Sequence, residues 1–316
     1  MSLKKLLVLL PIFSAATMAA EAEKNPYPGL NSTEIGLQSI SYKETLSNFA
    51  DIGDLSTDIS VTNTVVYASS YTNFSEKWGF MLTTQSNATS EFTNDEWELE
   101  GFGAVQNNTS KLTMNDLFAT GVYHIQGEMY ATFGAQLKTI RFLRTNFEAV
   151  EPVATTVNDA IRVSDKYFTD PNPPQITSNP LAGVEEDLTF INGIAGIYYN
   201  TAFAAKKRPL TWRVGASLSV PLLMTAQNSA LEQQYQIDSI DDSFNGYAVR
   251  LMAGTSYEFT KGFALTLNAN YMIGAYDEIN TRFTDNSGGT PVERTAAIPD
   301  VDLSSLQFTL GVLWIN

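Results

Sequence analysis

The segment LTLNANYMIG, residues 265–274, decides the fold, because its apolar side chains stand at every second position. Successive side chains of a β-strand point to opposite faces, so this spacing gives a strand with one apolar face and one polar or small-residue face. The apolar face carries Leu265, Leu267, Ala269, Tyr271 and Ile273. The segment therefore predicts a strand that separates a hydrophobic environment from an aqueous one.

The same alternation recurs along most of the chain after residue 35, with little sign of helical spacing, which predicts an all-β fold. Apolar residues occupy alternate positions over 59–67, 78–82, 129–137, 212–222 and 247–259, and we expect each set to form the outer, hydrophobic face of a wall. About ten strands are predicted, near 35–44, 57–71, 78–88, 112–125, 128–142, 188–201, 210–224, 244–259, 263–277 and 304–316. A hairpin hidden within 88–112 would raise the count to about twelve.

The predicted connections alternate in length. The short ones lie near 75–77, 126–128, 203–209 and 260–262, and the long ones at 45–57, 88–112, 148–187, 226–243 and 283–303. Short periplasmic turns and long extracellular loops are typical of a closed, antiparallel, up-and-down transmembrane β-barrel. Within the longest loop, a short helix is expected at 156–164.

Aromatic residues collect near the ends of the predicted strands. Tyrosine, tryptophan and phenylalanine form girdles where a barrel wall meets the two surfaces of the bilayer. The predicted interface aromatics are Trp78, Tyr257, Phe259, Phe263 and Trp314.

The final strand has apolar residues at every second position from Leu306 to Trp314, and it resembles the terminal strand of Gram-negative outer-membrane β-barrels. Trp314 matches the aromatic residue third from the end in that group, whereas Asn316 replaces the usual terminal aromatic residue. The resemblance implies a small porin-like barrel in the cell outer membrane. It also implies three partners, which are the barrel assembly machinery that reads this strand, the outer-membrane lipids and lipopolysaccharide.

The N-terminus has the order of a secretory signal peptide. The basic pair Lys4 and Lys5 precedes an apolar run and then a small-residue stretch that reaches Ala20. We predict a signal peptide at 1–22 and a single transmembrane barrel domain at 23–316. Beyond the signal, no apolar stretch approaches the ~18 residues that a membrane helix needs, so strands must cross the membrane.

The balance of charges and the absence of cysteine exclude several classes of protein. The chain has 19 Lys and Arg against 34 Asp and Glu, a net charge of -15, so nucleic acid is not an expected partner. Without cysteine there is no disulfide, thiolate ligand or lipid-modified N-terminal cysteine. Acidic residues gather over 91–100 and 185–187 without EF-hand spacing, so we expect a solvated acidic surface, no metal site and no cofactor.

The only histidine, His124, limits the possible catalytic chemistry. Omptins, which are surface proteases built on ten-stranded barrels, use a histidine with paired acidic residues at the extracellular rim, but His124 lies beside the predicted periplasmic turn 126–128. No Gly-x-Ser-x-Gly elbow and no Walker-type loop occurs. We predict no catalytic residues and no enzymatic activity.

Charged residues on the predicted inner faces mark the lumen. Arg213 and Arg250 fall on adjacent strands, Lys138 also points inward, and Glu258 lies lower on the same strand as Arg250. These candidates for lumen-lining residues would either select anionic or polar solutes or fill a narrow lumen with salt bridges.

The sequence favours a non-enzymatic, narrow, porin-like channel for small solutes. Two alternatives stay open. One is a surface-exposed, adhesin-like binding barrel with a plugged lumen, and the other is a soluble periplasmic β-sandwich or lipocalin-like binder, because soluble sheets alternate in the same way.

Overall fold

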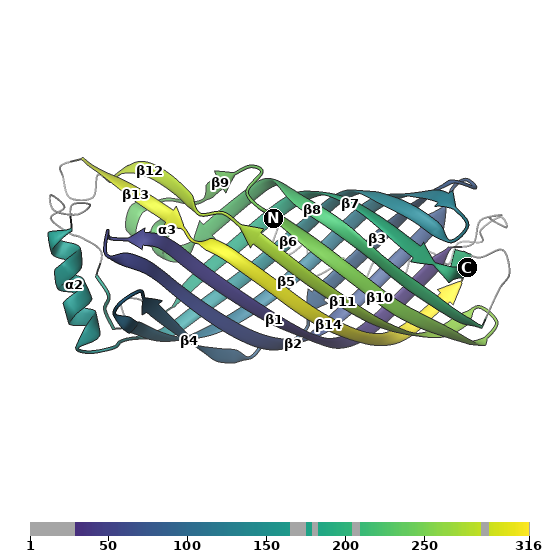
Figure 1. Ribbon diagram of the computed structural model, residues 1–316, viewed down its shortest axis with the longest axis horizontal. Helices are drawn as coiled ribbons and strands as arrows, with labels where there is room; N and C mark the ends of the chain where they lie inside the picture. The colour runs from purple at the N-terminus through teal and green to yellow at the C-terminus, as the bar shows by residue number, and fades with distance from the viewer. Residues whose placement is uncertain (1–28, 165–174, 179–182, 204–208, 286–290, 316) are drawn as a thin grey trace.

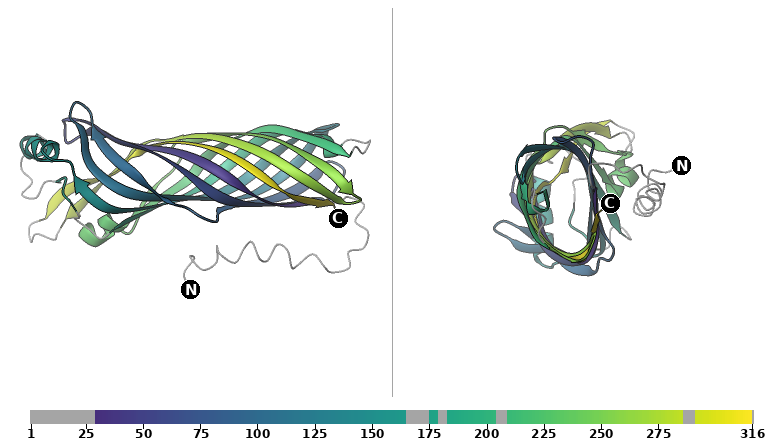
Figure 2. Two further views of the ribbon diagram at one scale, coloured as in Figure 1. Left: turned by 90° about the horizontal axis from the view of Figure 1, so that it is seen from below. Right: turned by 90° about the vertical axis from the view of Figure 1, so that its right-hand side faces the viewer.

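The structure is a computed structural model that describes residues 29–164, 175–178, 183–203, 209–285 and 291–315. The predicted signal peptide lies outside the described residues, as does 165–174 of the longest predicted loop. The described chain forms one long wall of tilted strands that closes on itself (Figures 1 and 2).

Ten antiparallel strands make up the closed wall. They are β1 (Leu30–Phe49), β2 (Gly53–Asn73), β3 (Trp78–Asn87), β5 (Gly103–Gln126), β6 (Met129–Ala149), β7 (Val184–Asn200), β8 (Leu210–Asn228), β10 (Tyr247–Thr260), β11 (Phe263–Tyr276) and β14 (Asp300–Ile315). Each pairs with the next in this series, and β1 also pairs with β14 from Leu30↔Ile315 to Thr45↔Asp300. The predicted up-and-down barrel of about ten strands is therefore confirmed.

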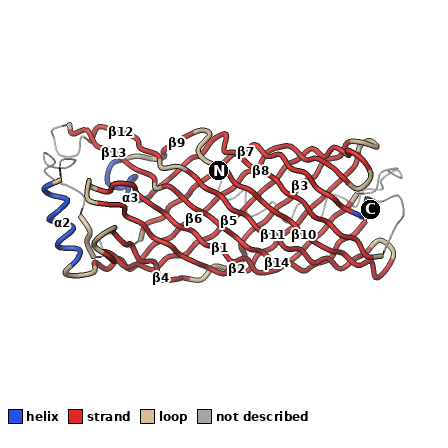
Figure 3. Tube along the Cα trace, in the orientation of Figure 1, coloured by secondary structure: helices blue, strands red, loops and turns tan. Residues whose placement is uncertain are grey.

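The remaining elements lie at one end of the barrel or at its rim (Figures 1 and 3). They are β4 (Phe92–Leu99), β9 (Ile240–Asp242), the hairpin of β12 (Ile279–Asp285) and β13 (Val292–Ile298), and the helices α2 (Val153–Val163) and α3 (Ser229–Tyr235), whereas the 3₁₀ turn η2 (Thr201–Phe203) follows β7 at the opposite end. The opposite end carries the start of β1, the end of β14 and the short turns, so we assign it to the periplasm.

An apolar belt surrounds the periplasmic half of the wall. Ile35 is 59% exposed, Leu267 51% and Leu310 54%, because all three side chains point away from the lumen and no other part of the protein covers them. The belt consists of the outward residues Ile35, Leu37, Val66, Phe80, Phe133, Ile191, Ile197, Val214, Leu218, Leu251, Leu265, Leu267, Ile273, Leu306, Phe308, Leu310 and Val312. An apolar outer surface on a closed sheet is typical of a barrel wall in contact with lipid. It excludes the soluble sandwich and lipocalin alternatives, because those folds bury their apolar faces inside.

The apolar face changes sides within single strands. In β1, Ile35 and Leu37 point outward, whereas Ile40 and Tyr42 point into the barrel and are fully buried. Beyond the belt the outer surface contacts water, so burial of apolar side chains is possible only on the inside. The expectation for 59–67 is therefore wrong, because its apolar residues face the lumen rather than lipid.

Two of the predicted long loops are mostly strands. The stretch 45–57 holds the ends of β1 and β2, and 88–112 holds β4 with the first part of β5. β4 lies between the same two neighbours as β3, since it pairs with β2 at Leu55↔Leu99 and with β5 at Phe92↔Lys111. The hairpin in 88–112 therefore lengthens the wall towards the outside, and the twelve-strand alternative is wrong.

A second, smaller core closes the extracellular tip. The helix α2, near the one expected at 156–164, buries Ala154, Val157 and Ile161. Val157 and Ile161 belong to a cluster with Leu99 and Val105 from the β4–β5 hairpin. None of the helices among the described residues is long and apolar enough to cross a membrane.

The belt predicts a depth-dependent response to charge. Leu267→Arg puts a guanidinium on the lipid-facing surface and should lower the free energy of unfolding in lipid vesicles by roughly 2–4 kcal/mol. The matched control, Ser60→Arg, places the same side chain outward on β2 beyond the belt and should change it by about 0.5 kcal/mol at most. Denaturant unfolding of both variants in the same vesicles checks this, and equal effects would contradict the assignment of the belt.

Candidate functional site

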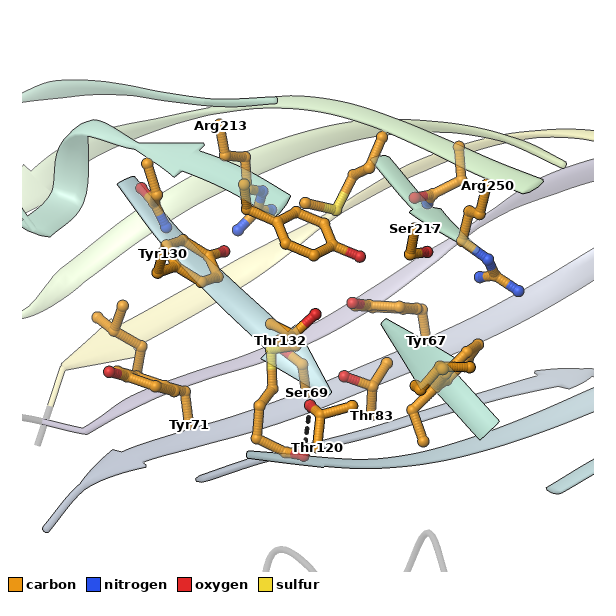
Figure 4. A pocket seen from close by; sticks show the side chains of 18 of the residues that line it. Tyr67, Ser69, Tyr71, Thr83, Thr120, Tyr130, Thr132, Arg213, Ser217 and Arg250 are labelled. Carbon is orange, nitrogen blue, oxygen red and sulfur yellow. Dashed lines mark hydrogen bonds between the residues drawn. The ribbon is translucent and has the colours of Figure 1, made fainter. Parts of the chain in front are cut away.

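A cavity of about 110 Å³ occupies the lumen at the level of the apolar belt (Figure 4). Tyr67, Tyr71, Tyr130 and Tyr198 supply most of its aromatic wall. Its smaller polar lining residues include Asn31, Ser69, Thr83, Thr120, Thr132, Asn200, Ser217 and Asn270. The cavity reaches the periplasmic end of the lumen, where the first residues of β1 and the last residues of β14 line it.

A glycine makes room for the aromatic wall. Tyr198 on β7 stands directly opposite Gly215 on β8. A Cβ atom at position 215 would lie 1.9 Å from the Tyr198 ring, so only glycine lets the ring lie flat against β8. Held there, the Tyr198 ring stacks on Tyr130 with 5.4 Å between the ring centroids.

The two predicted lumen arginines both line this cavity, and each faces a buried carboxylate. Arg213 donates to Asn268 Oδ1 at 2.7 Å and lies 3.6 Å from Glu34. Arg250 donates to Asp116 at 3.0 Å, and its guanidinium carbon lies 4.6 Å from the centroid of the Phe118 ring.

The other two predicted lumen residues lie apart from the cavity. Lys138 is completely buried beside Asp116 in the sheet, with Nζ 3.1 Å from Met272 Sδ. Glu258 faces inward near the periplasmic rim and accepts a hydrogen bond from the amide of Gly262 in the turn at 3.0 Å. The structure therefore brings together the two arginines, places Lys138 above them and leaves Glu258 outside the group.

Packed apolar side chains fill the lumen above the cavity. They come from nearly every strand of the ring and include Ile40, Tyr42, Ile59, Val61, Leu112, Met114, Ile140, Phe142, Leu188, Phe190, Met224, Met272 and Leu303. Phe190 and Tyr276 lie with their ring centroids 4.6 Å apart across the barrel interior. The cavity is therefore separated from the extracellular end by a hydrophobic core of the kind found in soluble proteins.

A buried charge cluster lies beyond this core. Arg144 on β6 is 3% exposed and contacts Glu44 at 2.6 Å, Asp95 at 2.9 Å and Glu186. Its guanidinium carbon lies 4.4 Å from the centroid of the Phe142 ring. The cluster joins β1, β4, β6 and β7, so it ties the extracellular hairpin to the main wall.

The pattern of the sequence does not predict this buried charge cluster. Asp95 was expected on a solvated acidic surface with the rest of 91–100, but it is 1% exposed and accepts from Thr57 at 2.5 Å. Glu34 and Asp116 were also missed as the partners of the lumen arginines. The alternation of each strand indicates that Glu34 and Asp116 face the lumen. It does not indicate which arginine each one meets, because that depends on the curvature of the closed sheet.

Aromatic and imidazole rings mark the periplasmic rim. His124 lies there, with Nε2 2.8 Å from Tyr71 Oη. Trp78 packs on Tyr123 at 4.8 Å between centroids, and Phe263 lies opposite Trp314 in the β11–β14 register. The predicted interface aromatics, with Tyr257 and Phe259, therefore lie at the periplasmic ends of their strands.

No protein-family model matches the sequence, and no curated protein matches it. Among solved structures, the outer membrane protease OmpT from Escherichia coli aligns over 93% of this chain and 99% of its own, with a TM-score of 0.58 and 9% identity. A Pseudomonas aeruginosa FadL homologue aligns over 92% of this chain and 90% of its own, with a TM-score of 0.33 and 10% identity. The translocator domain of the autotransporter NalP from Neisseria meningitidis aligns over 98% and 94%, with a TM-score of 0.36 and 11% identity.

By fold, the chain is an outer-membrane β-barrel. The closed ring and the match to OmpT agree on this fold, and the apolar belt around the ring agrees with a location in the outer membrane, as predicted. At 9% identity the match concerns the fold alone. The one histidine of the sequence, His124, lies at the periplasmic end of this barrel.

The charge cluster lies beyond the apolar belt, outside the membrane-spanning segments. Burial opposes the charge on Arg144, but its three carboxylate neighbours hold its pKa well above the ordinary value. Burial also raises the pKa of Glu44 from 4.5 to about 7, with Arg144 lowering it and Glu186 raising it further. Glu44 therefore binds a proton more tightly in the folded barrel than in the unfolded chain.

This shift gives the extracellular end a predictable pH dependence. Between pH 4.5 and about 7 the folded state binds more protons than the unfolded state, so its stability falls as the pH rises through this window. The protection factors of the β1, β4 and β6 amides near the cluster, which are the intrinsic exchange rates at each pH divided by the observed ones, should fall accordingly. Glu44→Gln should flatten the dependence, and an unchanged slope in this variant would contradict it.

Loss of the central cation should be far more damaging than loss of a surface one. Arg144→Met leaves three carboxylates together without their counter-ion and should destabilise the extracellular end by roughly 3–5 kcal/mol. The control is Arg141→Met on the same strand, because Arg141 pairs with Asp187 at 2.6 Å on the surface and should contribute about 1 kcal/mol at most. Proteolysis of the β4–β5 hairpin in the folded protein measures both.

Proposed function

We propose that this outer-membrane barrel is a non-enzymatic, surface-exposed binding protein whose lumen is plugged. The observation that supports this proposal is the order in which groups of side chains fill the lumen from the periplasmic to the extracellular end. A cavity lies at the periplasmic end, the Arg250–Asp116 pair borders it, the hydrophobic core follows, and the Arg144 cluster stands outermost. This order supports a wall that presents a surface rather than an open pore.

The extracellular half of the wall supports the binding role. On β5, outward side chains are polar from Asn115 upwards, and about twelve residues of that strand stand above the belt, or roughly 40 Å of chain before tilt. The helix α2 and its small core cover the tips of the hairpins. A rigid platform of this kind suits recognition better than mobile loops do.

The outer wall of this platform is acidic. Asp58 on β2 and Glu96 and Glu98 on the adjacent β4 all point outward and are exposed. Asp95, which immediately precedes Glu96 in the sequence, points inward to Arg144 instead. The exposed set supports a partner with a cationic surface, because opposite potentials steer association.

Passage of small solutes is the second candidate function. The cavity favours it, because the cavity already opens the periplasmic part of the lumen as far as Arg250. Passage would require displacement of the hydrophobic core, since Tyr42, Phe142 and Phe190 are almost completely buried in it.

Conductance separates the two candidates. The folded barrel in planar bilayers should show no steady ion-conducting steps, because packed side chains leave no continuous water path through the hydrophobic core. A porin of known conductance in the same bilayer is the control for the apparatus. Steady channel events from the folded barrel would overturn the plug and favour solute passage.

Charge reversal tests the binding role. Cells that display the barrel should adhere to surfaces coated with a cationic polypeptide more than cells without it. The triple variant Asp58→Lys, Glu96→Lys and Glu98→Lys should lose this gain, whereas Glu76→Lys, exposed in a turn at the periplasmic end, should keep it. If adherence is the same for cells with the barrel, cells without it and cells with the triple variant, the proposal is overturned.

A further inference from the structure

Charged side chains inside the belt region do not balance. Lys138, Arg213 and Arg250 are cationic, and the carboxylates among them are Glu34 and Asp116, so the group has one more positive than negative charge. Glu258 lies apart from this group, at the periplasmic rim, where it accepts a hydrogen bond from a turn amide. A buried excess charge is unfavourable unless a counter-ion or strong acceptors accompany it.

Hydrogen-bond donors at the cavity also lack acceptors. Both hydrogen bonds that the structure gives Arg250 use Nη2, which leaves Nε and Nη1 without a partner among the described residues. Asn31 lines the cavity, is 5% exposed, and its buried Nδ2 has no hydrogen-bond partner. Such groups normally meet ordered water or a ligand.

The remaining wall is aromatic and of limited size. Tyr67, Tyr71 and Tyr130 offer ring faces (Figure 4), as does Tyr198. Phe118 continues this surface next to Arg250. At about 110 Å³, the cavity is near the scale at which an engineered cavity of about 150 Å³ accepts one benzene ring. The volume and the lining of the cavity therefore match one ring rather than a lipid or a peptide.

We propose that the cavity binds a small aromatic monoanion, with one ring among the tyrosines and its acid group at Arg250, entering from the periplasmic end. The acid group would supply a negative charge and acceptors for Nε and Nη1 of Arg250, while the ring would fill the apolar part of the cavity. This inference does not depend on the surface-binding proposal, because it holds whether or not the lumen conducts.

Three probes test the match in the folded barrel in zwitterionic detergent at neutral pH. Benzoate has the ring and the charge, benzamide has the ring alone, and acetate has the charge alone. Calorimetric titration should give saturable binding of benzoate and at least about tenfold weaker binding of the other two. Benzamide binding as tight as benzoate would overturn the anionic part of the proposal, and no benzoate binding would mean that the cavity holds water only.

Variants locate the site. Thr132→Leu fills the cavity from β6 and should weaken benzoate binding at least about tenfold, whereas Thr139→Leu, which points outward on the same strand, should not. If Thr132→Leu does not fold, Ser217→Leu fills the cavity from β8. The double variant Arg250→Gln with Asp116→Asn removes the ion pair without isolating either partner, and it should weaken benzoate but not benzamide. Unchanged benzoate binding in the folded filled variant, or in the double variant, would overturn the site.

Discussion

Lipid cannot accept or donate a hydrogen bond, and the rest of this structure depends on that constraint. A strand facing hydrocarbon must pair on both edges, so the sheet has to close, and β1 meets β14 to close it. Closure then fixes a narrow lumen that ten strands can fill with side chains. The buried ion pairs, the aromatic wall and the hydrophobic core are all consequences of having that interior.

Along its length a strand passes from lipid at the belt to water beyond it. The face that carries the apolar side chains changes from the outside to the inside of the barrel between the two. Around the belt, apolar residues such as Leu267 face outward while polar residues such as Asn268 face the lumen. Beyond the belt, Ile40 and Phe142 are buried inside and serine, threonine and charged residues face water. The lower half is therefore built like a membrane protein and the upper half like a soluble barrel.

This reversal explains which parts of the fold could be predicted from the sequence. Strands such as 263–277 lie largely within the belt, keep one phase and were predicted with the correct outer face. The apolar residues of 59–67 alternate just as clearly, but period two does not say which face is the inner one. The sequence predicts loops at 45–57 and 88–112 because the polar outer residues there do not resemble a lipid-facing strand. In the site, Arg213 and Arg250 were predicted to face the lumen, but Glu34 and Asp116 come from other strands of the ring, and only its curvature brings them together.

The seam between β1 and β14 joins residues from the two ends of the barrel sequence, such as Leu30 and Ile315. The wall consequently cannot be completed while any later part of the polypeptide is still missing. A chain interrupted before its last strand would keep two unpaired edge strands, and each could pair with strands of other molecules. Export of the whole polypeptide must therefore precede closure of the barrel.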